Sequence, residues 1–118
     1  MAGKYAIYID DNFDFMDKDG RSYFGSFDTQ TLAAKAMKLI IGGDLIKWAC
    51  KYSTAEELLK HYKSFGDDPF CPGLDFSAWT WAEGRCKELV SMTPEELEIE
   101  KARHDREWEK MLELRRND

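Results

Sequence analysis

The chain has 118 residues and a mass of 13.7 kDa, and its 17 basic and 23 acidic residues give a net charge of −6. This length is typical of a single domain, and an aromatic content of 14% argues against disorder. The negative charge argues against a protein that coats nucleic acid through phosphate contacts, so direct nucleic-acid binding is not expected.

Aromatic and charged residues divide the chain near residue 92. Fifteen of the 16 aromatic side chains precede residue 93, with Trp108 as the exception, whereas the last 26 residues carry 15 charged groups. We therefore expect one globular α+β domain over residues 1–92 and a charged C-terminal helix over residues 93–118.

The first two elements predicted are strands. Residues 4–9 are β-branched and aromatic, as strands prefer. The turn-forming residues 17–20 separate them from a second strand over 21–27, in which the period of two puts Phe24 on the face opposite Tyr23. The pair predicts a two-stranded antiparallel hairpin, which needs three or four helices to cover one of its faces.

A helix is expected from about residue 30, capped by Asp28 or Thr29. The pair Gly42-Gly43 weakens this helix and leaves open whether it is one kinked helix or two, in which case Asp44 caps the second.

Two further helices follow in the globular part. The segment 53–56 matches a capping box that begins with Ser53, and Gly66 ends the helix that it starts. Residues 67–76 contain two prolines and a glycine and are predicted to be a loop, after which Ser77 caps a helix that runs to about Leu89.

The segment 93–96, Thr-Pro-Glu-Glu, is the clearest helix start in the sequence. It predicts a helix that reaches about Arg116, with Leu97, His104, Trp108 and Met111 in a narrow stripe. This stripe either docks on the globular part or pairs with another copy. We favour a projecting or loosely docked helix that joins a partner, and Trp108 and Met111 are the candidate contacts, including those of a homodimer.

Five carboxylates lie within residues 10–19, where Lys18 is the only basic residue. Oxygen-rich clusters suit Mg²⁺ or Ca²⁺, and Asp10, Asp11 and Asp14 are the candidate ligands. The spacing does not fit an EF-hand, because Phe15 and Ser26 would occupy ligand positions. The expectation is therefore an ordinary polar loop without a cofactor.

Candidate interaction residues lie in the second half of the globular part. Trp79 and Trp81 point to different sides of a helix, so we place Trp81 inside and leave Trp79 partly exposed as an interface anchor. Asp67 and Asp68 form a second acidic turn. If this turn meets the one at residues 10–12 in space, the two make one negative site for a cation or a basic partner.

The three cysteines are an odd number, and no signal peptide or stretch of about 20 apolar residues is visible. These features favour a cytoplasmic protein without a membrane anchor.

Four segments together resemble a family of small bacterial proteins that has no established activity. The resemblance covers about the first 90 residues and implies a bacterial or mobile-element cytoplasmic protein, without a catalytic residue to carry over. The segments are residues 9–13 (Ile-Asp-Asp-Asn-Phe) with Met16, residues 25–29 (Gly-Ser-Phe-Asp-Thr), residues 65–70 (Phe-Gly-Asp-Asp-Pro-Phe), and residues 76–79 (Phe-Ser-Ala-Trp) with Arg85 and Cys86.

Three functional hypotheses follow from the sequence. The first is a non-enzymatic interaction or regulatory protein that acts through protein contacts, because no complete catalytic motif is present. The second is a metal-dependent hydrolase that uses the Asp-rich loop. The third is an acidic mimic of nucleic acid that inhibits a DNA-binding partner.

Overall fold

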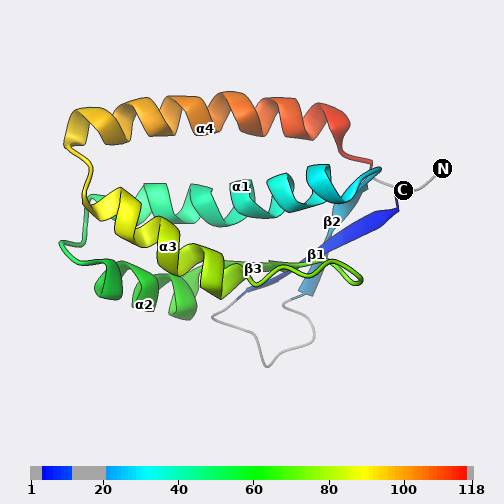
Figure 1. Ribbon diagram of the computed structural model, residues 1–118, viewed down its shortest axis with the longest axis horizontal. Coiled ribbons are helices and arrows are strands. Elements are labelled where there is room, and N and C mark those ends of the chain that lie inside the picture. The colour runs from blue at the N-terminus through cyan, green and yellow to red at the C-terminus, as the bar shows by residue number, and fades with distance from the viewer. Residues whose placement is uncertain (1–3, 12–20, 117–118) are drawn as a thin grey trace.

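The computed structural model describes residues 4–11 and 21–116, and it confirms an α+β architecture with four helices, of which the last is a long C-terminal helix (Figure 1). None of the helices in these ranges is long and apolar enough to cross a membrane. The elements in chain order are β1 (Tyr5–Asp11), β2 (Arg21–Phe27), α1 (Gln30–Ala49), α2 (Ala55–Phe65), β3 (Asp67–Phe70), α3 (Ala78–Val90) and α4 (Pro94–Leu114).

The sheet has three antiparallel strands in the order β2-β1-β3, so the predicted two-stranded hairpin was incomplete. The missing strand, β3, lies in the segment predicted to be a loop. Its sequence, Asp-Asp-Pro-Phe, has little strand propensity of its own, and the pairing with β1 supplies its structure. Pro69 is tolerated because β3 is an edge strand, where one row of backbone groups has no partner strand.

A bulge in β2 changes which of its aromatic residues face the core. Ile7 pairs with Gly25 and Tyr8 with Tyr23, so Phe24 is an extra residue without an opposite partner. Phe24 packs against the core, whereas Tyr23 contacts Tyr8 on the other face, with the ring centroids 5.6 Å apart and the rings tilted by 53°. The strict alternation of faces therefore breaks at the bulge, although Tyr23 and Phe24 lie on different sides as expected.

Helix α1 is one continuous helix, which settles the question raised by its two glycines. The two glycines lie where α1 packs against the ring of His104 on α4. A Cβ atom on Gly43 would lie 3.2 Å from the ring of His104, whose Nε2–H donates to the carbonyl oxygen of Leu39 at 2.8 Å. Of the two alternatives, a second helix capped by Asp44 is therefore excluded, because Asp44 lies within α1 and accepts a hydrogen bond from β3.

The residues that cap the helices agree closely with those predicted, and the cap of α2 lies one residue later than predicted. Ser77 caps α3 as predicted, and of the two candidates for α1, Asp28 and Thr29, it is Thr29 that caps the helix. The cap of α2 is Thr54 rather than Ser53, because the Oγ1 atom of Thr54 accepts from the backbone N–H of Glu57 at 3.2 Å. Local hydrogen bonding thus fixes where these helices begin.

Helix α4 lies along α1 and returns to the sheet (Figure 1). Its predicted capping box forms between Thr93 and Glu96, but the helix ends at Leu114 rather than near Arg116. Arg116 instead pairs with Ser26 of β2 through two backbone hydrogen bonds of 2.8 and 2.9 Å. Its guanidinium also binds the carboxylate of Asp28, which holds the pKa of Asp28 below its ordinary value.

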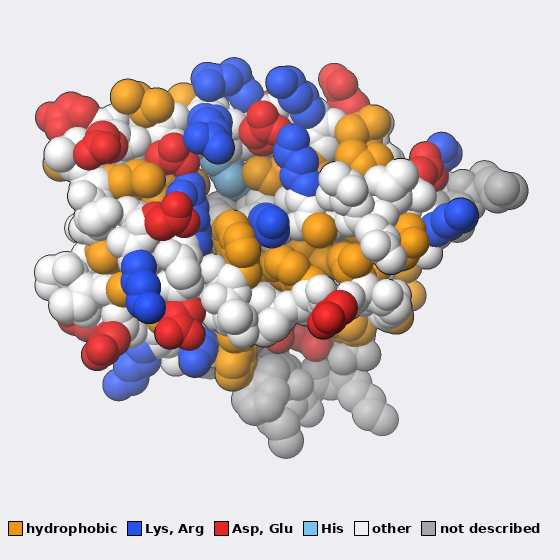
Figure 2. Space-filling view, in the orientation of Figure 1, with side chains coloured by type: hydrophobic (Ala, Val, Ile, Leu, Met, Phe, Trp, Pro, Cys, Tyr) orange, Lys and Arg blue, Asp and Glu red, His pale blue; other side chains and the backbone are white. Residues whose placement is uncertain are grey.

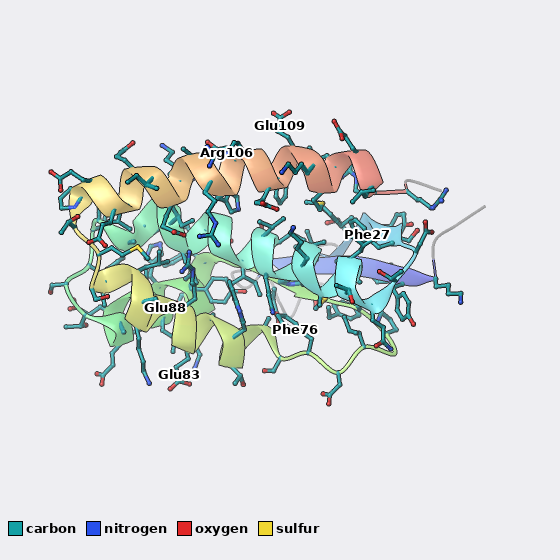
Figure 3. All side chains as sticks on the ribbon, turned by 45° about the horizontal axis from the view of Figure 1, so that its top comes forward. Phe27, Phe76, Glu83, Glu88, Arg106 and Glu109 are labelled. Atoms are coloured by element: carbon teal, nitrogen blue, oxygen red, sulfur yellow. The ribbon has the colours of Figure 1, made fainter. Side chains whose placement is uncertain are left out.

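The buried side chains form two clusters, and α1 contributes to both of them. Phe76, in the segment between β3 and α3, packs against both clusters and joins them (Figure 3). The helical cluster contains Ile41, Leu45, Ala49, Leu58, Tyr62, Ala78, Ala82, Cys86 and Leu89. The cluster beneath the sheet contains Ile7, Phe27, Ala33, Ala36, Met37, Ile40, Cys71 and Met111.

Candidate functional site

The antiparallel register of β1 and β3 brings the two predicted acidic turns together. Asp10 lies directly opposite Asp68, and Asp11 lies opposite Asp67. Directly opposed side chains on neighbouring strands have Cβ atoms about 5 Å apart. The third candidate metal ligand, Asp14, lies outside the described residues.

Helices α1 and α2 hold this acidic strand in place. The backbone N–H of Asp67 donates to Oδ2 of Asp44 at 2.9 Å, and the hydroxyl of Tyr62 donates to the carbonyl oxygen of Asp67 at 2.5 Å. Burial raises the pKa of Tyr62 well above its ordinary value, and the charges of Asp68, Asp44 and Asp67 raise it further. Tyr62 is therefore a neutral hydrogen-bond donor over the whole working pH range.

Asp68 is a partly buried carboxylate that lies opposite another carboxylate. Burial, and then the negative charge of Asp10, raise the pKa of Asp68 above its ordinary value. Within residues 4–11 and 21–116, however, no three His, Cys, Asp or Glu side chains come together as a group that could hold a metal ion.

We expect Asp68→Asn to stabilise the protein by about 0.5 kcal/mol at pH 7, because it removes a charge that is partly buried and lies directly opposite Asp10. A raised carboxyl pKa means that the folded state favours the protonated form, so the cost of the charge grows as the pH rises through that pKa. The gain should therefore disappear below the ordinary aspartate pKa of 3.8. Urea denaturation at several pH values measures the gain in free energy of unfolding, with Asp75→Asn at an exposed position as the control. A gain that persists at low pH would contradict this explanation.

The other candidate interaction residues have different environments. Trp79 is 44% exposed, as predicted for an anchor, and the ammonium of Lys63 lies 5.0 Å from the centre of its ring. Met111 is only 4% exposed, and Trp108 packs on Phe24 and His104. The stripe of α4 thus contacts its own chain, and a second copy would have to use other residues of this helix.

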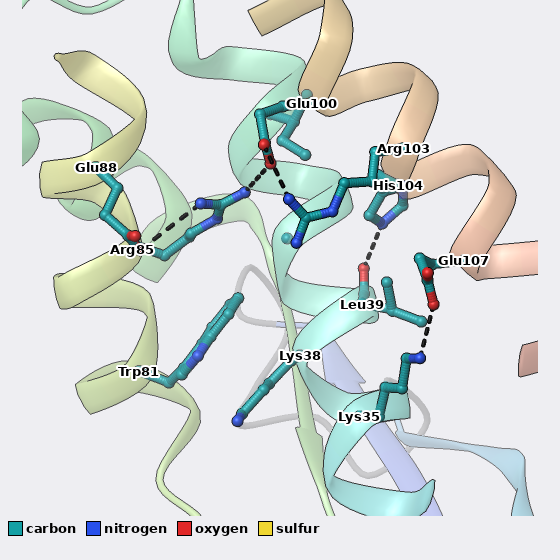
Figure 4. A pocket seen from close by; sticks show the side chains of 12 residues that line it. Lys35, Lys38, Leu39, Trp81, Arg85, Glu88, Glu100, Arg103, His104 and Glu107 are labelled. Atoms are coloured by element: carbon teal, nitrogen blue, oxygen red, sulfur yellow. Dashed lines mark hydrogen bonds and ion pairs between the residues drawn. The ribbon is translucent and has the colours of Figure 1, made fainter. Parts of the chain in front are cut away.

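An open groove of about 360 Å³ lies on α1 between α3 and α4, and Figures 2 and 4 show it. Leu39, Gly42 and Ile46 of α1 lie on its floor, on the stripe that also carries Lys35 and Lys38. Trp81 of α3 and His104 of α4 also line it. Partly buried apolar side chains are therefore accessible at its base.

Ion pairs fix the walls of the groove. Arg85 of α3 donates from Nη2 to Oε2 of Glu100 on α4 at 2.6 Å, and both side chains are largely buried, at 18% and 17% exposure. Lys35 of α1 binds Glu107 of α4 at 2.7 Å and holds the pKa of Glu107 below its ordinary value. These contacts join α1, α3 and α4 around the groove, which is therefore preformed (Figure 4).

Basic side chains are in excess in the groove, although the chain as a whole is acidic. Four basic residues and three acidic residues line it. The ammonium of Lys38 makes no ion pair or hydrogen bond within the described ranges. The guanidinium of Arg103 lies 3.4 Å from an oxygen of Glu100, a carboxylate that Arg85 already binds, and its charge also helps to lower the pKa of Glu107. Lys38 and Arg103 thus remain able to bind an anionic group.

Sequence reasoning missed this groove. Trp81 was expected inside, whereas it is partly buried and lines the groove, and none of the groove's charged residues was a candidate. One usable signal exists, because Lys38, Gly42 and Ile46 lie on one stripe of a long helix that is otherwise largely apolar. The placement of α3 and α4 on either side of that stripe depends on tertiary packing.

No protein-family model matches the chain, and no curated protein or solved structure matches it either.

Proposed function

We propose that this protein is a non-enzymatic interaction protein that binds a protein partner through the groove between α1, α3 and α4. The observation that supports the proposal most is the combination of accessible apolar groups on the floor with the cations Lys38 and Arg103 above them. Apolar anchors surrounded by charged groups are typical of surfaces that bind other proteins. The preformed walls favour binding, because less conformational freedom is lost on association.

Site-specific photo-cross-linking in the native host tests this function. Glu88 lines the groove, whereas Glu83 lies on another side of the same helix (Figure 3). We expect a photoreactive residue at position 88 to cross-link to a host protein and one at position 83 to give no such product. Equal products at both positions, or none at position 88, would contradict binding at the groove.

A second candidate is a metal-dependent hydrolase, and the register that sets Asp10 opposite Asp68 favours it. A divalent cation would relieve the repulsion that raises the pKa of Asp68. Thermal melting with millimolar Mg²⁺ or Ca²⁺ tests this candidate: a metal-dependent rise in Tm that Asp10→Asn abolishes would support it, and an unchanged Tm would exclude it.

The remaining hypotheses receive less support. Acidic and basic side chains alternate over the face shown in Figure 2, which does not favour a mimic of nucleic acid. The proposed membership in the family of small bacterial proteins assigns no role to any residue. Cytoplasmic localisation is part of the proposal, and it suits a protein with an exposed thiol at Cys50.

A further inference from the structure

We infer that the partner's contribution to the groove is an amphipathic helix whose apolar stripe is flanked by acidic residues. This inference rests on the proposed function and adds the chemistry of the partner. It depends on the shape of the groove, on the backbone that lines it and on its charge.

The shape of the groove favours a protein segment over a small molecule. Small-molecule sites enclose most of their ligand. This groove instead lies open between two helices on the face shown in Figure 2. An occupant would remain exposed on one side, as a helix does when only one of its faces is buried.

The backbone around the groove favours a helix over an extended segment. All of the residues that line it belong to α1, α3 or α4, so within this lining no strand edge offers backbone hydrogen bonds. An extended segment would leave its own N–H and C=O groups without partners against the apolar floor, whereas a helix satisfies them internally. A helix would also lie on α1 between α3 and α4 and complete a four-helix arrangement.

The charge of the groove selects acidic flanks on that helix. Lys38 and Arg103 lie on α1 and α4, above a floor that includes Leu39 and Ile46. A helix that places leucine-like side chains on this floor would bring its flanking positions close to these two cations. Glutamate or aspartate there would form ion pairs, whereas lysine or arginine would meet like charges.

Gly42 is a position from which a side chain can block the groove. A Cβ atom on Gly42 would lie 3.8 Å from Cη2 of Trp81 and 3.9 Å from Cδ2 of His104, which are ordinary contact distances. Gly42→Leu therefore fills the base of the groove. The matched control is Gly84→Leu in α3, because no described atom lies within 4 Å of a Cβ atom on Gly84.

The test uses two synthetic amphipathic helices of about 20 residues, which differ only in having glutamate or lysine beside the same leucine stripe. Binding to the full chain is measured by calorimetry and by the NMR shift of the Trp81 indole N–H. We expect the acidic peptide to bind at least about tenfold more tightly than the basic one and to weaken as salt increases. Gly42→Leu should abolish this binding and Gly84→Leu should retain it, while Lys38→Glu with Arg103→Glu should reverse the preference.

Several outcomes would overturn the inference. These are equal or tighter binding of the basic peptide, undiminished binding to Gly42→Leu, and no binding of either peptide. Self-association of the full chain that Gly42→Leu abolishes would assign the groove to a second copy instead. A cross-link at position 88 combined with no peptide binding would leave the proposed function standing and refute only the acidic helix.

Discussion

Replacing Gly66 with alanine is expected to destabilise the protein by about 3 kcal/mol, because the added methyl group has no space. Gly66 is the C-cap of α2, with φ at −81°, so its backbone conformation is open to any residue. The requirement for glycine comes from Tyr62, because a Cβ atom at position 66 would overlap its ring and lie 2.8 Å from its carbonyl oxygen. Tyr62 is fully buried and cannot move aside freely.

The consequence should extend to the acidic strand. The hydroxyl of Tyr62 donates to the carbonyl oxygen of Asp67, so a displaced ring removes one of the contacts that hold β3 against the helices. Urea denaturation measures the free energy of unfolding, and hydrogen exchange measures the protection of residues 67–70. We expect the free energy of unfolding and the protection of this strand both to fall.

The control for this prediction is Gly84→Ala. Gly84 lies within α3, where alanine adds helix propensity and meets no described atom within 4 Å, so a gain of about 1 kcal/mol is expected. In a Tyr62→Leu background, Gly66→Ala should cost less than in the natural chain. The same cost in both backgrounds would refute the overlap with the tyrosine ring as the cause.

The ion pair between Arg85 and Glu100 is expected to contribute a coupling energy of about 2 kcal/mol in a double-mutant cycle. The pair is short, at 2.6 Å, and largely shielded from water. Removing only Glu100 leaves a mostly buried guanidinium with Glu88, 3.7 Å away, as its remaining ion-pair partner in the described ranges. Arg85→Ala, Glu100→Ala and the double variant, compared by urea denaturation, give this energy.

A second ion pair on α3 provides the matched control. Lys87 and Glu83 lie 4.0 Å apart, with side chains that are 70% and 58% exposed, and we expect their coupling to be below about 0.5 kcal/mol. Added salt should weaken the exposed pair more than the shielded one. Equal coupling energies for the two pairs would show that the bridge between α3 and α4 contributes no more than a surface contact.

Some features of the candidate site follow from local sequence, and others depend on contacts between distant segments. The acidic residues 10, 11, 67 and 68 could be selected from composition, but only the pairing of β3 with β1 brings them into register. Trp79 could be assigned as exposed from helical geometry alone. The groove could not be predicted, because its floor comes from α1 and its walls come from α3 and α4, which follow much later in the sequence, and packing decides which of their faces meet.

The sequence by itself determined the α+β class and the starts of the helices at Ser77 and Thr93, and it limited the start of α1 to Asp28 or Thr29, since capping bonds and apolar periodicity act over a few residues. Only the tertiary structure decided the third strand, the unbroken α1, and the docking of α4. Each of these depends on a distant partner: β1 supplies the hydrogen bonds of β3, His104 packs against Gly43, and Ser26 pairs with Arg116. Such contacts carry no local signal, because their free energy arises only when the elements pack together.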